Sequence, residues 1–193
     1  MKMMNFKKVL DNIDISPMAN EIMANDRLWI KARNDIKPWQ GGYQHRMIEV
    51  LPLRVQNIPK EAQTDPKVYE KCSHDIIAYD RPEFINFPET RRFIYRLMEA
   101  VGGLHVGRTA YVNLPSGKSI DGHYDTGYCA EYYTRYHVMI NGDRGNWMQC
   151  GEGNETEWLE MLTGECWTFS HLKWHSFENR SGTPRIYLNI DIR

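Results

Sequence analysis

The chain has 193 residues and a net charge of −1, with 41% apolar and 25% charged residues. This length suits one domain with a sizeable core, and the composition is that of a globular protein. The balanced charge gives no global field that would attract nucleic acid, and no apolar run approaches the ~20 residues that span a bilayer. The first residues, MKMMNFKKVLDNID, lack the apolar stretch of a secretory signal.

The four cysteines show no CxxC spacing, which predicts free thiols in a reducing, cytoplasmic environment. A zinc site formed by Cys150, Cys166 and His171 is the alternative, although paired ligand spacing is missing. We expect no membrane or nucleic-acid partner, and the sequence leaves the oligomeric state open.

Residues 1–103 have a mixed and partly helical pattern. Ser16 and Pro17 are typical of a helix start, with Ser as the N-cap and Pro at the first helical position. Residues 34–46 contain proline and paired glycines and are expected to form a loop. Residues 46–53 are expected to form a strand.

The clearest helix is predicted over residues 88–101. Its apolar side chains form one stripe at helical spacing, namely Phe93, Ile94, Leu97, Met98 and Val101. Two glycines at 102–103 end the pattern. We interpret the stripe as core packing rather than as a cofactor site.

Beyond residue 103, apolar residues recur at every second position, which is typical of strands. Strands are expected near residues 104–114, 119–125, 134–141, 146–150, 165–170, 174–179 and 184–192. So many short strands predict a mainly β sandwich or jelly roll, with residues 1–103 as an α/β support. We expect one domain over residues 1–193, with the core at 104–193.

The last expected strand, RIYLNIDI, alternates between two faces. One face carries Ile186, Leu188, Ile190 and Ile192, and the other carries Arg185, Tyr187, Asn189 and Asp191. We expect the apolar face to pack against the helical part of the chain and the polar face to line a wet space.

His123 and Asp125 are two residues apart within an expected strand, so their side chains would project from the same face. An imidazole and a carboxylate there can occupy two adjacent positions of one metal ion. A third ligand would leave three positions open, which suits iron(II) with a chelating co-substrate and dioxygen. Alone, one such pair is expected by chance in a chain of this composition.

His175 supplies the second part of the pattern, because it begins another strand-like run about fifty residues further on. Arg185 follows ten residues later, after a turn at 181–184. An antiparallel hairpin would place Arg185 beside the strand of His175, where its guanidinium can pair in bidentate fashion with a carboxylate. The sequence therefore predicts a three-ligand metal site with Arg185 as the anchor of a co-substrate that chelates the metal.

Arg135 and His137 share one face of the strand expected over residues 134–141. Donor groups that face inward are costly unless they meet an anion, so these two are candidates for a second anchor of the same dicarboxylate. The alternative is a solvated strand face.

Three segments resemble the aspartyl/asparaginyl β-hydroxylase family of 2-oxoglutarate/iron(II) oxygenases. GHYD is similar to the family's His-x-Asp motif, WHSFENRSGTPRIYLNIDI to its distal segment with His and Arg, and RYHVMIN to its Arg-x-His strand. The resemblance covers residues 104–192 and implies a double-stranded β-helix core of the cupin type. It further implies that His123, Asp125 and His175 bind iron(II).

By the same resemblance, Arg185 would bind the distal carboxylate of 2-oxoglutarate, and Arg135 with His137 the carboxylate nearer the metal. Asn113 would be a further contact of the co-substrate. The implied reaction uses O2 to hydroxylate an unactivated C–H bond of an amino-acid side chain and releases succinate and CO2. The substrate would be a free amino acid, a small derivative or a residue within a peptide.

Several aromatic and polar residues near the expected site are candidates for substrate contacts, with packing as the alternative for each. They are Tyr111, Tyr124, Tyr128, Trp147 and Gln149, followed by Tyr132, Tyr133 and Tyr136. Trp29 and Trp39 are candidates to cover the barrel mouth. Two other protein classes remain open, namely a cupin-type metalloenzyme that does not use 2-oxoglutarate and a non-catalytic jelly-roll binding protein.

Overall fold

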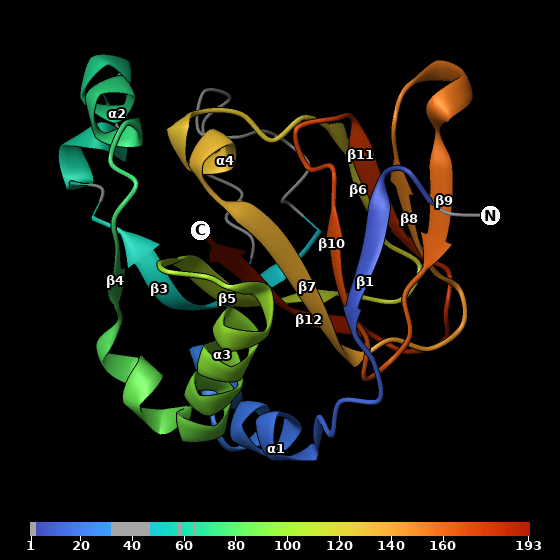
Figure 1. The fold of residues 1–193 in the computed structure, drawn as a ribbon. Helices are drawn as coiled ribbons and strands as arrows, with labels where there is room; N and C mark the ends of the chain where they lie inside the picture. Colours follow the sequence, from blue (N-terminus) through green and yellow to red (C-terminus); the bar gives the residue numbers. More distant parts are fainter. Residues whose placement is uncertain (1–2, 32–46, 58, 64) are drawn as a thin grey trace.

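The computed structural model describes residues 3–31, 47–57, 59–63 and 65–193. The loop expected over residues 34–46, including Trp39, therefore lies outside the described residues. The described part contains two antiparallel sheets, with α1 (Ser16–Ala24) and α3 (Pro88–Val101) beneath the larger one (Figure 1). No described helix is long and apolar enough to cross a bilayer.

Strands from both halves of the chain build the larger sheet. Its order within the described residues is β1 (Phe6–Leu10), β10 (Cys166–Phe169), β7 (Thr134–Asn141), β12 (Arg185–Ile192), β5 (Val106–Leu114), β3 (Glu49–Gln56) and β2 (Ile30–Lys31), and β4 (Ala78–Asp80) pairs with β3. The smaller sheet has the order β6 (Ser119–His123), β11 (His175–Asn179), β8 (Asn146–Cys150) and β9 (Glu157–Glu160). Two sheets face to face are the expected jelly-roll core, so the predicted fold class is confirmed.

The strands expected after residue 103 are all present, with ends that differ by at most two residues. β3 begins three residues later than the expected strand at 46–53. The short elements β9 and α4 (Tyr128–Tyr132), and the edge strand β1, were not expected. An edge strand or a single helical turn is too short to show a period of its own.

Strand β12 confirms the expected division of its two faces. Its apolar face, which includes Leu188 and Ile190, packs with Ile22 of α1 and with Ile94 and Leu97 of α3. These side chains form the helix-side core between the larger sheet and the helices. The opposite face of β12 points toward the smaller sheet, where a second core contains Tyr187.

Helix α3 has the predicted bounds, and its N-terminus is capped by α1. The carboxylate of Glu21 accepts the backbone N–H groups of Glu89 (2.5 Å) and Thr90 (3.0 Å) and the Thr90 hydroxyl (2.6 Å). Gly102 ends the helix at φ +69°, a conformation that favours glycine. Helix α1 starts at Ser16 itself, whose N–H donates to Asp14 Oδ1, so Ser16 is not the N-cap that the sequence suggested.

The four cysteines are free thiols, as predicted. Cys166 lies in the helix-side core, whereas Cys150 lies between the sheets. His171 Nε2 donates to the Ala130 carbonyl at 2.8 Å. Since the two cysteines lie on opposite sides of the larger sheet, the alternative zinc site does not form.

Candidate metal and co-substrate site

Two histidines meet where β6 and β11 pair. β6 ends at His123 and β11 begins at His175, and the two residues are direct partners in the antiparallel register. Their ring centroids lie 4.3 Å apart. The sequence therefore places one imidazole from each strand at the same end of the smaller sheet.

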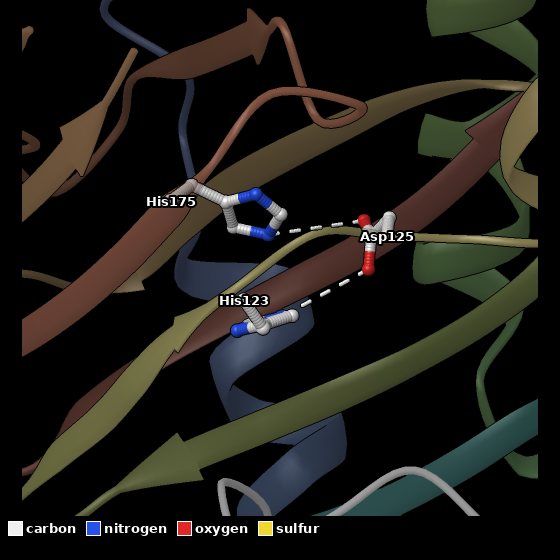
Figure 2. A group of neighbouring side chains, drawn as sticks. All are labelled: His123, Asp125 and His175. Carbon is white, nitrogen blue, oxygen red and sulfur yellow. Dashed lines mark ion pairs between the residues drawn. The ribbon is translucent and has the colours of Figure 1, made fainter. Parts of the chain in front are cut away.

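Asp125 completes a three-residue cluster with these histidines (Figure 2). Its Oδ1 lies 3.9 Å from His123 Nε2 and its Oδ2 lies 3.9 Å from His175 Nε2. Asp125 follows β6 rather than lying in it, so the expected same-strand geometry is wrong. Its position is fixed instead by its N–H, which donates to the His171 carbonyl at 3.2 Å, and by an ion pair with Arg135.

Backbone carbonyls orient both imidazoles. His123 Nδ1 lies 2.8 Å from the Asp121 oxygen, and His175 Nδ1 lies 2.9 Å from the Lys173 oxygen. A carbonyl can only accept, so each Nδ1 carries the proton and each Nε2 presents a lone pair. This is the arrangement in which histidine binds a metal.

The protonation states also suit a metal. Burial lowers the pKa of His175 to about 4, so this imidazole is neutral at pH 7. Burial alone would raise the pKa of Asp125, but Arg135 and then the neighbouring histidines lower it overall. Because metal ligands must be deprotonated, the cluster requires little rearrangement of protons. Bonds of ~2.0–2.1 Å place adjacent ligand atoms about 3 Å apart, so only a small contraction is needed.

Gly122 and Trp174 precede the two histidines and pack against each other. A Cβ atom at Gly122 would overlap the indole ring of Trp174. We expect Gly122→Ala to weaken iron(II) binding at least tenfold, because either the indole or β6 must move and each adjoins a ligand. Competition with a chromophoric chelator measures the affinity. Gly182→Ala, whose added methyl group meets no atom within 4 Å, is the matched control; equal affinities of the two variants would contradict this account.

A chain of alternating charges extends from Asp125 across the larger sheet. Arg135 pairs with Asp125 and, through Nε, with Asp191 Oδ1 at 2.9 Å. Asp191 Oδ2 in turn accepts from Arg108 Nε at 3.0 Å. Arg135 is thus engaged by two carboxylates of the protein, which differs from the expected contact with a co-substrate carboxylate.

Asp191 holds the two guanidiniums of this chain. Burial alone would raise its pKa, but Arg135 and Arg108 lower it overall, so its stabilising effect is complete at neutral pH and is lost only as pH falls through this lowered value. We expect Asp191→Asn to reduce the free energy of unfolding by about 1.5–3 kcal/mol, since the buried Arg135 then keeps only Asp125 and Arg108 loses its one carboxylate. Urea denaturation at pH 7 measures the loss.

The control for this prediction is Asp11→Asn, which breaks an exposed pair with Lys8. We expect that change to leave the free energy of unfolding nearly unchanged, because solvent screens an exposed ion pair. If Asp191→Asn costs no more than its control, the charge chain does not stabilise the fold.

Arg185 is fully buried at the start of β12. Its guanidinium carbon lies 4.9 Å from the ring of Phe177 and 5.0 Å from that of Tyr187. It donates to the Trp147 carbonyl at 3.3 Å, and its Nε has no partner among the described residues. No carboxylate of the described chain pairs with it, and burial lowers its pKa to about 10. A buried guanidinium without an anion is costly, which favours an anionic ligand.

The route by which Arg185 reaches this position differs from the expected one. β11 and β12 do not form a hairpin, because β11 pairs with β6 and β8 while β12 pairs with β5 and β7. The connection crosses from the smaller to the larger sheet. Asn179 fixes the crossing, since its Nδ2 donates to the carbonyls of Leu114 and Thr183 at 2.9 Å each.

His137 is buried among the rings of Phe169, Phe177 and Tyr187. Burial, followed by the charges of Arg185 and Arg135, lowers its pKa well below the ordinary value. Its Nδ1 has no partner among the described residues. The strand face of Arg135 and His137 is therefore enclosed rather than solvated.

One cavity of about 450 Å³ lies between the sheets. Its walls include all three residues of the His–Asp–His cluster, together with Arg135 and His137. The remaining lining residues are Ile48, Val50, Pro52, Arg54, Val55, Gln56, Arg108, Thr109, Ala110, Val112, Ile120, Phe169, Phe177, Tyr187 and Asn189. Arg185 does not line it but lies against Phe177 and Tyr187, which do. The cavity therefore joins the cluster to a space bounded by β3 and β5.

Four of the residues expected to contact ligands do not line this cavity, because their side chains point away from it. Tyr111 is buried in the helix-side core, with its hydroxyl 2.6 Å from Thr90 Oγ1. Asn113 shares that face of β5 and donates to Glu49. Trp147 and Gln149 alternate with the inward side chains of β8 and lie on the outer face of the smaller sheet.

The other aromatic candidates lie partly on the surface and partly in packed regions outside the cavity. Tyr124 and Tyr128 are each 50% exposed and do not line the cavity. Tyr136 and Trp29 pack into or against the helix-side core, so Trp29 does not cover the barrel mouth. Tyr133 is buried and donates to the Ile76 carbonyl at 2.8 Å.

Arg108 and Asp191 are the site residues that sequence reasoning missed. Asp191 belonged to the expected polar face of β12, but its partners lie on β5 and β7 and have no fixed spacing from it in the chain. Arg108 alternates with Ala110 and Val112 on one face of β5. That alternation was the available signal.

Known proteins of the same fold place the chain in context. A prolyl-4-hydroxylase from Pseudomonas putida superimposes with a TM-score of 0.58 at 13% identity, covering 98% of this chain and 92% of that one. An oxidoreductase of the 2OG-Fe(II) oxygenase family from Burkholderia pseudomallei superimposes with a TM-score of 0.54 at 14% identity, covering 90% of this chain and 78% of that one. At these identities the likeness concerns the fold.

Among curated proteins, no sequence matches the chain. The model of the aspartyl/asparaginyl beta-hydroxylase family matches residues 53–193, a segment that contains the whole His–Asp–His cluster and Arg185. A match over well more than half of the chain shows membership, and the chain belongs to the aspartyl/asparaginyl β-hydroxylase family of enzymes.

Proposed function

We propose that the protein is a 2-oxoglutarate- and iron(II)-dependent dioxygenase that hydroxylates an unactivated C–H bond of an amino-acid side chain. His123, Asp125 and His175 would hold the iron. With 2-oxoglutarate and O2, bound iron(II) would supply the oxidising power for hydroxylation, with succinate and CO2 as co-products. The family membership supports the reaction class.

The observation that carries the proposal is the pairing of two features between the same sheets. The three ligand atoms lie within 4.8 Å of one another, and because each Nδ1 is bonded to a backbone carbonyl, both Nε2 atoms are turned toward Asp125. Nearby, Arg185 is a fully buried cation without a carboxylate partner in the described chain. A metal site beside a guanidinium that lacks a carboxylate partner suits a dicarboxylate ligand. One end of that ligand would chelate the metal, and the other would form an ion pair with Arg185.

The other residues of the site keep it dry and oriented. Arg135 holds Asp125 toward the histidines, and its own charge is maintained by Asp191. Phe169, Phe177 and Tyr187 wall the cavity around His137, so the polar groups there act in a low dielectric. We propose that His137, whose Nδ1 is unpaired, contacts the co-substrate as expected from the sequence.

Aerobic turnover tests the proposal. The protein, loaded with iron(II), should convert 2-oxoglutarate into succinate, and a substrate from a panel of free amino acids and peptides should gain one oxygen atom by mass spectrometry. His175→Ala should release no succinate. Metal-dependent chemistry without consumption of 2-oxoglutarate would instead indicate a cupin-type enzyme, and absence of metal binding would indicate a binding protein.

A further inference from the structure

Arg108 is a cation in the cavity that the iron and 2-oxoglutarate do not require. It projects from β5 and lines the cavity with the His–Asp–His cluster. Its side chain is 37% exposed, and only its Nε is engaged, by Asp191 at 3.0 Å. Within the described part of the chain, its two terminal nitrogens have no hydrogen-bond partner. These nitrogens can therefore donate hydrogen bonds to a ligand in the cavity.

The balance of charge around the cavity also favours an anionic ligand. Three guanidiniums, those of Arg108, Arg135 and Arg185, face two carboxylates, those of Asp125 and Asp191, which leaves one positive charge. The guanidinium of Arg54, also in the cavity wall, pairs with Asp80, which in addition accepts from Arg91 outside the cavity. A divalent metal and a dianionic co-substrate cancel each other, so the surplus remains after both bind.

The surplus lies at Arg108 rather than elsewhere. Arg135 touches two carboxylates, and Arg185 is the anchor already assigned to the co-substrate. Arg108 shares its one carboxylate, Asp191, with Arg135. Because the described chain engages only the Nε of Arg108, the rest of its guanidinium can form charge-assisted hydrogen bonds with an anion that enters the cavity.

The wall around Arg108 is apolar and contains small side chains. Val50 and Pro52 of β3 and Ala110 and Val112 of β5 face the same cavity. An anion that binds there would therefore carry an apolar body of modest size.

We propose that Arg108 binds a carboxylate of the substrate, and that the substrate is a small amino acid with a free carboxylate and an apolar side chain. This inference rests on the proposed oxygenase function. The same carboxylate chemistry is also offered by an aspartate side chain within a peptide, and the experiment separates these two sources.

The test compares wild-type protein with Arg108→Met and with the control Arg144→Met, whose arginine is 85% exposed and remote from the cavity. Succinate release is measured with free L-amino acids, with the same amino acids as C-terminal amides, and with end-blocked peptides that contain aspartate. Ligand-observed NMR measures binding of the same compounds to metal-free protein, which needs no turnover.

We expect free amino acids to stimulate succinate release and their amides to fail. Arg108→Met should raise the KM for the active amino acid at least tenfold while changing the affinity for 2-oxoglutarate less than twofold, and Arg144→Met should change neither. Stimulation by the blocked peptides, lost in Arg108→Met, would support the carboxylate anchor and assign the carboxylate to a peptide.

Equal stimulation by acids and amides, or an unchanged KM in Arg108→Met, would overturn the inference while leaving the oxygenase function intact. If wild-type protein converts no 2-oxoglutarate under any condition, the proposed function fails. The NMR binding measurement then tests the role of Arg108 by itself. Carboxylate binding that depends on Arg108 would then still support the anchor, and its absence would overturn it.

Discussion

Replacement of Arg185 by methionine should raise the Kd for 2-oxoglutarate by at least 100-fold while leaving the affinity for iron(II) within about twofold. The guanidinium is fully buried between Phe177 and Tyr187 and pairs with no carboxylate of the described chain. Truncating one partner of a buried charge pair costs ~2–5 kcal/mol, and each 1.4 kcal/mol is tenfold in Kd. Anaerobic titration of the iron-loaded protein with 2-oxoglutarate measures the change.

The same substitution should not destabilise the ligand-free protein. A buried guanidinium without an anion is unfavourable, so an apolar side chain of similar length should leave the free energy of unfolding equal or higher. Arg180→Met, at an exposed arginine in the connection before β12, is the control for both measurements. Loss of iron and 2-oxoglutarate binding together in Arg185→Met would mean that Arg185 supports the metal site rather than the co-substrate.

His175→Ala should reduce iron(II) affinity at least 100-fold without unfolding the protein. His175 Nε2 is one of three ligand atoms, and altering a residue that merely supports a ligand already costs ~10–100-fold in metal affinity. The imidazole is neutral at pH 7, so its removal leaves no buried charge unpaired. Metal analysis after anaerobic gel filtration measures bound iron, and circular dichroism confirms the fold.

The control is His105→Ala, which removes an exposed histidine before β5. We expect that variant to bind iron as the wild type does. Retention of stoichiometric iron by His175→Ala would place the metal elsewhere and would favour a purely hydrogen-bonding role for the cluster.

Period and spacing were sufficient to predict the parts of the fold that repeat. The helical period of α3 and the two-residue period of β12 are both long. α3 has the predicted bounds, β12 begins one residue after its expected start, and both have the predicted apolar faces. The sequence also predicted that the two histidines lie close together, and in the structure the antiparallel β6–β11 pair places the end of one strand beside the start of the other.

Period does not say which face of a strand is the inner one. In β8 the inward side chains are Met148 and Cys150, while the larger Trp147 and the polar Gln149 point outward. In β5 the polar Asn113 and the phenol of Tyr111 both lie on the face away from the cavity, where Asn113 Nδ2 donates to Glu49 and the Tyr111 hydroxyl is bonded to Thr90. The choice depends on partners from β3 and α3, which no local pattern contains.

The remaining differences between the predicted and the observed structure arise from contacts between residues that are far apart in the sequence. The crossing between β11 and β12 cannot be distinguished from a hairpin by the turn at 181–184, since both need the same reversal. The ion pairs of Asp191 depend on the strand order β7–β12–β5, which emerges only in the assembled sheet. Arg108 could be recognised as a site residue only once that order placed it beside Asp191.

The most direct test of the central assignment is anaerobic visible spectroscopy of the protein titrated first with iron(II) and then with 2-oxoglutarate. We expect the absorption of the iron–2-oxoglutarate chelate to develop at one equivalent of iron in the wild type, to need far more 2-oxoglutarate in Arg185→Met, and to be absent in His175→Ala. A wild-type protein without this absorption, or a His175→Ala variant that retains it, would contradict the account.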